Sequence, residues 1–168
     1  MKRILILCVF FMLTGCDKNY HDGLLEKLFG INDLKYKIIC SNEEFSSGGE
    51  GFYYCVYELD KISLDEIINS KLVGFPVKPE YRANWEVAKW EKTPVKLSDL
   101  PLYKYCCEYH RPIDFEKCFS ELFEKIIIEK EGNYYSSFYY DNKEEPVYVD
   151  FFILVPSKNR LYFVSQKT

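Results

Sequence analysis

The side chains with the most chemical potential are three thiols and one imidazole that lie close together in the chain: Cys106, Cys107, His110 and Cys118. Cysteine and histidine are the usual ligands of structural zinc, but this spacing follows no zinc motif, and adjacent cysteines bind one ion with awkward geometry. A reactive thiol at Cys106 or Cys107 is a second interpretation. We favour a disulfide from Cys118 to either Cys106 or Cys107, with the other thiol buried. The pattern therefore predicts no metal and leaves the choice between these two cysteines open.

The chain offers few residues for a catalytic set of nucleophile, histidine and acid, because His21 and His110 are the only histidines. His110 is flanked by Arg111 and Pro112 in a predicted turn, so we expect it at the surface or capping a backbone group. The carboxylate pairs Asp65-Glu66 and Glu144-Glu145 fall at a predicted helix start and turn, where solvated charges are usual. We predict that the chain is not an enzyme and needs no cofactor.

The first sixteen residues predict export. Lys2 and Arg3 precede an apolar run from Ile4 to Leu13, which as a helix would reach about 15 Å, half of a bilayer's hydrocarbon core. A basic start followed by a short apolar run is typical of a secretory signal. The competing interpretations are a buried N-terminal strand and a plain secreted protein.

The residues Leu13-Thr14-Gly15-Cys16 resemble the lipobox of bacterial lipoprotein precursors. This resemblance implies that signal peptidase II removes residues 1–15 and that Cys16 carries diacylglycerol, often with a further acyl chain. Two or more acyl chains give stable membrane attachment. Residues 16–22 would then form a lipidated tether of at most about 20 Å, ahead of a single domain over residues 23–168. Asp17 resembles the inner-membrane retention signal of enteric bacteria, so the periplasmic face of the inner membrane is preferred over the outer membrane.

The charge balance excludes one class of partner. Without Lys2 and Arg3, the 22 basic residues fall to 20 against 26 acidic ones, a formal charge of −6. Phosphate binding needs a basic surface, so we expect no nucleic acid partner. The same charge argues against a second contact with anionic lipids.

Cys8 is removed with the signal, and Cys40 and Cys55 lie on two alternating segments around a Gly-rich loop, which predict a β-hairpin. Apolar residues then share one face and opposite charges meet on the other. The register is Tyr36–Leu59, Lys37–Glu58, Ile38–Tyr57 and Cys40–Cys55. In an oxidising compartment this register predicts a Cys40–Cys55 disulfide.

The whole pattern predicts an α+β domain with an antiparallel sheet packed by two to three amphipathic helices. The sheet consists of the N-terminal hairpin and a C-terminal three-stranded meander. Expected helices begin at Asp22, Ser63 and Asp114; the expected meander strands cover residues 134–140, 147–155 and 161–164. A further strand is expected near residues 85–91, whereas residues 97–110 are ambiguous.

Four residues between Pro79 and Trp90 have the types enriched at binding hot spots: Tyr81, Arg82, Trp85 and Trp90. The interpretation we favour is that both tryptophans fill the core while Arg82 makes a local salt bridge. From the short tether, the disulfide-bonded domain, the acidic charge and the lack of a catalytic set, we predict a lipid-anchored periplasmic interaction protein with a protein partner in the envelope, of the inhibitor or immunity type. The second hypothesis is an envelope-maintenance factor that binds peptidoglycan or other glycans through this aromatic surface, and an enzyme ranks third.

Overall fold

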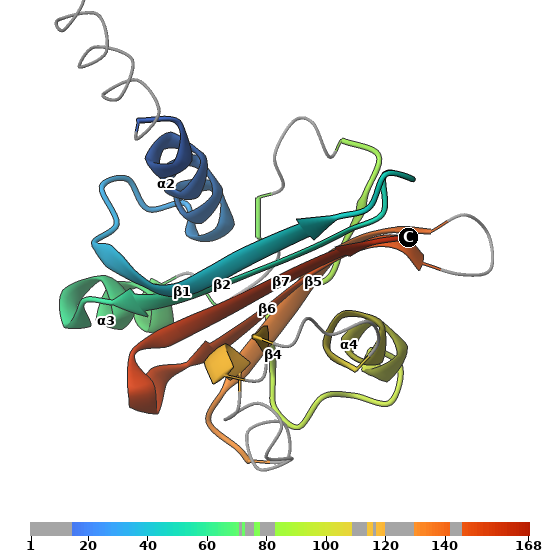
Figure 1. Cartoon of the computed structure of the whole chain (residues 1–168). Helices are drawn as coiled ribbons and strands as arrows, with labels where there is room; N and C mark the ends of the chain where they lie inside the picture. Colours follow the sequence, from blue (N-terminus) through green and yellow to red (C-terminus); the bar gives the residue numbers. More distant parts are fainter. Residues whose placement is uncertain are drawn as a thin grey trace, which may run out of the picture.

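An antiparallel seven-stranded sheet forms the centre of the computed structural model, with helices on both faces (Figure 1). The structure describes residues 15–70, 72, 76–77, 83–108, 114–115, 117–119, 130–141 and 146–168. The strand order is β1-β2-β7-β6-β5-β3, and β4 also pairs with β5. The predicted α+β class is confirmed, and the hairpin and the meander join where β2 pairs with β7.

The strands are β1 (Tyr36–Phe45), β2 (Gly51–Leu59), β3 (Glu86–Val87), β4 (Glu91–Lys92), β5 (Tyr134–Asp141), β6 (Pro146–Val155) and β7 (Arg160–Lys167). The described helices are α2 (Gly15–Phe29), α3 (Lys61–Ser70) and α4 (Leu100–Cys107), and a 3-10 turn covers Pro156–Lys158.

The hairpin register is confirmed at its first three pairs and wrong after them. Tyr36 faces Leu59, Lys37 faces Glu58 and Ile38 faces Tyr57. A β-bulge between Ile38 and Cys40 then advances β1 by one residue, so that Cys40 faces Val56 instead of Cys55. Because side chains alternate across a strand, this shift moves Cys40 to the opposite face of the sheet from Cys55.

The middle strand of the meander, β6, is covered on both sides, as its apolar composition predicts. Val149, Phe151, Ile153 and Val155 point to one face, and Asp150, Phe152 and Leu154 point to the other. All seven are buried. The sheet therefore has two separate cores.

The first core lies under α2, and we call this side the α2 face. It contains apolar residues of α2 and α3 and the inward side chains of four strands: Leu24, Leu25, Leu28, Phe29, Leu64, Ile67, Cys55, Tyr57, Phe138, Phe152 and Phe163, among others. The helix α2 starts at Gly15, seven residues before the predicted start at Asp22. His21, predicted to lie on the tether, is instead buried, with Nδ1 of its ring 2.7 Å from the Tyr57 hydroxyl.

The second core lies under α4, and we call this side the α4 face (Figure 1). Its members include Phe52, Tyr54, Tyr103, Cys106, Cys107, Phe115, Phe119, Phe151 and Tyr162. The ambiguous segment 97–110 thus contributes a helix, α4, which begins with Pro101 in its first turn, where the missing N–H has no intrahelical partner.

The helix starts predicted at Ser63 and Asp114 differ in how they compare with the structure. Asp60, not Ser63, caps α3: its carboxylate accepts hydrogen bonds from the Ile62 N–H at 2.9 Å and the Ser63 N–H at 3.2 Å. In the helix predicted after Asp114, Phe115 and residues 117–119 are helical, and most of the rest lies outside the described residues. The strand expected over residues 85–91 is divided into the two short strands β3 and β4.

Candidate functional site

An open pocket of about 440 Å³ lies where the tip of the β1–β2 hairpin meets the end of β7. Its lining comes from three places in the chain that pairing of β2 with β7 brings together. The lining residues are Glu44, Phe45, Ser46, Glu50, Gly51, Phe52, Gln166, Lys167 and Thr168. Sequence reasoning missed this site, because none of its parts carries a motif.

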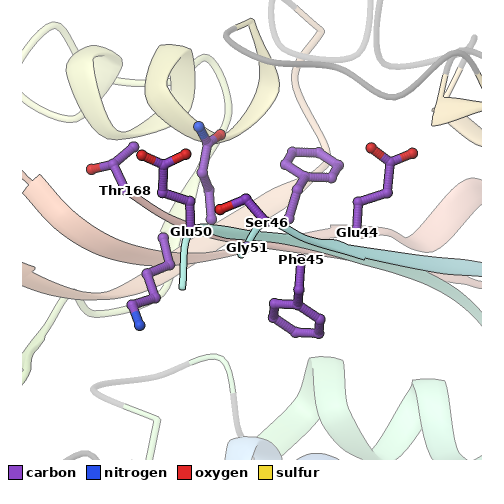
Figure 2. A pocket seen from close by; sticks show the side chains of 9 residues that line it. Glu44, Phe45, Ser46, Glu50, Gly51 and Thr168 are labelled. Carbon is purple, nitrogen blue, oxygen red and sulfur yellow. The ribbon is translucent and has the colours of Figure 1, made fainter. Parts of the chain in front are cut away.

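Two opposing surfaces meet at the pocket. Figure 2 shows the carboxylates of Glu44 and Glu50 on one side of the sheet and the ring of Phe45 on the other. Glu44 pairs with Phe52, a member of the α4 core, so the carboxylates belong to the α4 face. Lys167 turns the other way, with its Nζ 5.0 Å from the centre of the Tyr148 ring. The α4 side of the pocket is therefore acidic.

A glycine determines the shape of the other side. A Cβ atom on Gly51 would lie 2.5 Å from two carbons of the Phe45 ring, well inside van der Waals contact. The ring therefore lies directly over the Gly51 backbone. Phe45 is nonetheless 68% exposed, so it presents a large apolar surface at the rim.

Gln166 supplies a buried hydrogen-bond acceptor to the lining. The residue is 3% exposed, and its Oε1 accepts no hydrogen bond from the residues that the structure describes. Buried polar atoms are satisfied in most proteins, and an exception needs an explanation. Gln166 is buried beneath the pocket, whereas the carboxylates at its α4 side are suited to a guanidinium or ammonium group.

The hydroxyl of Tyr105 connects the pocket to α4. It donates to the Val147 carbonyl at 3.2 Å and lies 2.8 Å from Oγ1 of Thr168. Burial raises the pKa of Tyr105, and the nearby charge of Glu50 acts in the same direction. The two contacts of the hydroxyl hold Val147 and Thr168 against α4.

The predicted disulfides are both wrong, because Cys40 is bonded to Cys118. The Cα atoms of the pair are 6.1 Å apart, within the usual disulfide range. The bulge in β1 turns Cys40 toward the α4 face, where the segment containing Cys118 packs. The disulfide thus ties the edge of the sheet to the segment that covers it.

Cys55, Cys106 and Cys107 are buried thiols. Burial raises the pKa of Cys55 to about 11 and that of Cys106 well above its ordinary value. The Cys106 thiol lies 3.5 Å from the Val149 carbonyl. Because the thiolate is the reactive form, these two groups are poor nucleophiles at neutral pH.

The alternative interpretation of Cys106, Cys107, His110 and Cys118 as zinc ligands concerns residues that the structure describes only in part. His110 lies outside the described residues, and Cys118 is bonded to Cys40. Among the residues that the structure describes, no group of three or more His, Cys, Asp or Glu side chains could hold a metal ion.

The predicted aromatic surface is only partly exposed. Trp90 is buried, 5% exposed, and stacks on Phe29 with ring centroids 5.5 Å apart, so it fills the α2 core. Trp85 is half-buried and tilted against the Tyr148 ring at 5.3 Å. Tyr81 and Arg82 lie outside the described residues.

Cys16 lies at the second position of α2. No helix in residues 15–70 or the later described segments is long and apolar enough to cross a membrane. Comparison of the chain with protein families, with curated proteins and with solved structures found no match.

Proposed function

We propose that the chain is a lipid-anchored protein of the bacterial envelope whose domain binds a protein partner near the membrane. The lipobox-like residues end at Cys16, the second residue of α2, and this junction is the observation that carries the proposal. His21, five residues after Cys16, is held against the sheet through Tyr57. An acylated Cys16 would therefore hold the sheet itself close to the bilayer.

The Cys40–Cys118 disulfide supports the same compartment, because disulfides persist in oxidising environments such as the periplasm. The acidic pocket supports the binding role. Its carboxylates would accept hydrogen bonds from a basic side chain of the partner. The inner membrane remains the preferred address, on the resemblance of Asp17 to the retention signal.

Mass spectrometry of the mature protein tests the anchor. We expect loss of residues 1–15 and a diacylglycerol-modified Cys16, together with membrane fractionation of the wild type. The matched variant Cys16→Ser should remain unlipidated and should leave the membrane fraction. A mature chain that retains residue 1 without a lipid would overturn the anchoring.

Cross-linking in isolated membranes tests the pocket. Glu50→Lys should remove a partner that the wild type captures, and Glu58→Lys, an exposed acid on the same strand pair but away from the pocket, should retain it. Equal capture by the two variants would contradict the pocket's role.

A second candidate function is binding of peptidoglycan or other glycans, and the observation that favours it is the half-buried Trp85 beside Tyr148. Paired aromatic rings are suited to the apolar faces of sugars. A muropeptide-binding assay with wild type and Trp85→Ala separates the two functions, since protein capture at the acidic pocket should not depend on Trp85.

A further inference from the structure

The outer edge of the sheet is a long strand whose outer side bears no neighbouring strand in the described part of the chain. This strand, β1, is ten residues long and forms the end of the strand order. Three of its apolar side chains are exposed: Ile38 by 37%, Ile39 by 39% and Phe45 by 68%. A long, exposed and partly apolar edge is a template for pairing with another strand.

The backbone groups of β1 that point outward can be assigned from both of its ends. The Asp60 N–H donates to the Lys35 carbonyl at 3.1 Å, and the Ser46 N–H donates to the Glu50 carbonyl at 2.9 Å. In an antiparallel ladder, alternate residues bond to the same neighbour. Counting inward from the two ends and across the bulge, the residues that turn their N–H and C=O groups outward are Tyr36, Ile38, Ser41, Glu43 and Phe45.

When the extra residue of the bulge is left out of the count, these outward residues are arranged symmetrically about Ser41. If a second β1 runs antiparallel and the two bulges occupy equivalent places, Ser41 meets Ser41 and every outward residue meets an outward residue. Tyr36 then faces Phe45, and Ile38 faces the aliphatic stem of Glu43. Hydrogen-bonded positions therefore coincide along the whole strand.

The charges are also self-complementary in this register. Lys37 and Glu44 both point to the α4 face, because they pair with Glu58 and Phe52 within the hairpin. In the paired edges, Lys37 of each copy lies opposite Glu44 of the other, which gives two cross-strand ion pairs. Opposite charges at directly facing positions stabilise strand pairing, and like charges destabilise it. A register slip by one residue would place these side chains on different faces.

We propose that the partner of the β1 edge is a second copy of this chain, joined by a two-fold axis through Ser41 and perpendicular to the sheet. This axis places the α2 faces of both copies on one side of the joined sheet and their α4 faces on the other side. Both α2 helices then lie on one side of a continuous sheet, so both Cys16 residues can reach the same membrane under the anchoring proposed above. The second copy also brings its Lys37 to Glu44, at the rim of the pocket.

Light scattering of the full-length protein in detergent micelles tests the pairing. We expect the wild type to contain two chains for each particle. Lys37→Glu and Glu44→Lys should each contain one chain, because each variant places like charges opposite each other. The double variant K37E/E44K should again contain two, since it restores the pairs with reversed sign.

Circular dichroism of each variant checks that the hairpin remains folded. A wild type with one chain for each particle would overturn the proposal, as would single variants that keep two. Failure of the double variant to recover the dimer would likewise overturn it, even if both single variants are folded monomers.

A substituted cysteine tests the position of the axis. Ser41→Cys should form a covalent dimer under mild oxidation, because hydrogen-bonded residues in facing strands have Cα atoms about 5.5 Å apart. Ser47 is also exposed but lies in the hairpin loop, away from the axis, so Ser47→Cys should not cross-link. A dimer that cross-links through Ser47→Cys, or fails to cross-link through Ser41→Cys, would contradict this register.

Discussion

The two faces of the sheet are covered in different ways. The α2 face lies under a fifteen-residue helix, whose apolar side chains pack into the core and whose His21 bonds to Tyr57. The α4 face lies under an eight-residue helix and a segment with Phe115 and Phe119, and the Cys40–Cys118 disulfide fastens that segment to the sheet. One face is held by noncovalent packing, and the other also needs a covalent bond.

The α2 cover is a single helix whose apolar residues are deeply buried. Four residues of α2 that recur at helical spacing, Leu24, Leu25, Leu28 and Phe29, are all at most 3% exposed. Such a stripe stabilises a helix on a sheet without further help. On the α4 face the described covering rings come from two parts of the chain, α4 and residues 114–119, and ordering each of them costs conformational entropy. A disulfide reduces that loss by restricting the unfolded chain.

The largest effect should come from removing the covalent bond. For a cross-link spanning 78 residues, the chain-entropy argument gives a stabilisation of about 4.5 kcal/mol. Replacing Cys40 and Cys118 by serine should lower the free energy of unfolding by about that amount in urea titrations. Reductant should destabilise the wild type similarly and leave the double variant unchanged; a wild type insensitive to reductant would contradict this.

The next effect should come from a cavity on the α2 face. Leu25 is fully buried, and Leu25→Ala should cost about 3 kcal/mol from lost transfer energy and an unfilled cavity. The loss of unfolding free energy caused by Leu25→Ala should be the same in the oxidised and the reduced protein. Phe119→Ala, on the α4 face, should cost less after reduction, because the segment is then less firmly held. Urea titrations of both variants with and without reductant measure this contrast.

A smaller effect should follow loss of the buried polar contact in the α2 core. Tyr57→Phe removes the hydroxyl that lies 2.7 Å from Nδ1 of His21. We expect a loss of about 1–2 kcal/mol, because a buried ring nitrogen then lacks this partner. Tyr140→Phe, at a 39% exposed tyrosine, provides the control and should change the unfolding free energy little.

The smallest effect should be the pH dependence of the α3 cap. Hydrogen bonds from the Ser63 hydroxyl, and then from backbone N–H groups, hold the pKa of Asp60 below its ordinary value. The carboxylate therefore contributes stability above its ordinary pKa, and this contribution is lost as the pH falls through the lowered pKa. Asp60→Asn should flatten the acid limb of the stability–pH profile by less than about 1 kcal/mol. An identical acid limb would show that the carboxylate does not contribute.

The alternating patterns predicted the hairpin and the meander, because the apolar residues of a strand recur with a period of two. The face of Cys40 could not be predicted, since a bulge at Ile39 leaves no compositional trace. The cap of α3 was misassigned because Asp60 and Ser63 are both good capping residues three positions apart. His21 was misplaced because a polar residue before a predicted helix gives no sign of a buried partner 36 residues away.

The pocket could not be predicted for a related reason. Its acids and its buried Gln166 come from the hairpin tip and the last strand, and only the pairing of β2 with β7 brings them together. Sequence patterns describe how one element is built, whereas this site depends on which elements become neighbours. The segment from Pro79 to Trp90 shows the reverse case. Its residue types are common at binding surfaces, but Trp90 is buried in the core.

The bulge in β1 also constrains how this chain can change over evolutionary time. Without the bulge, the same sequence would place Cys40 opposite Cys55, on the face away from Cys118. Deletion of Ile39 would instead give a regular strand that keeps Cys40 opposite Val56 and within reach of Cys118. Lineages that lose the codon for Ile39 should therefore keep both cysteines of this disulfide.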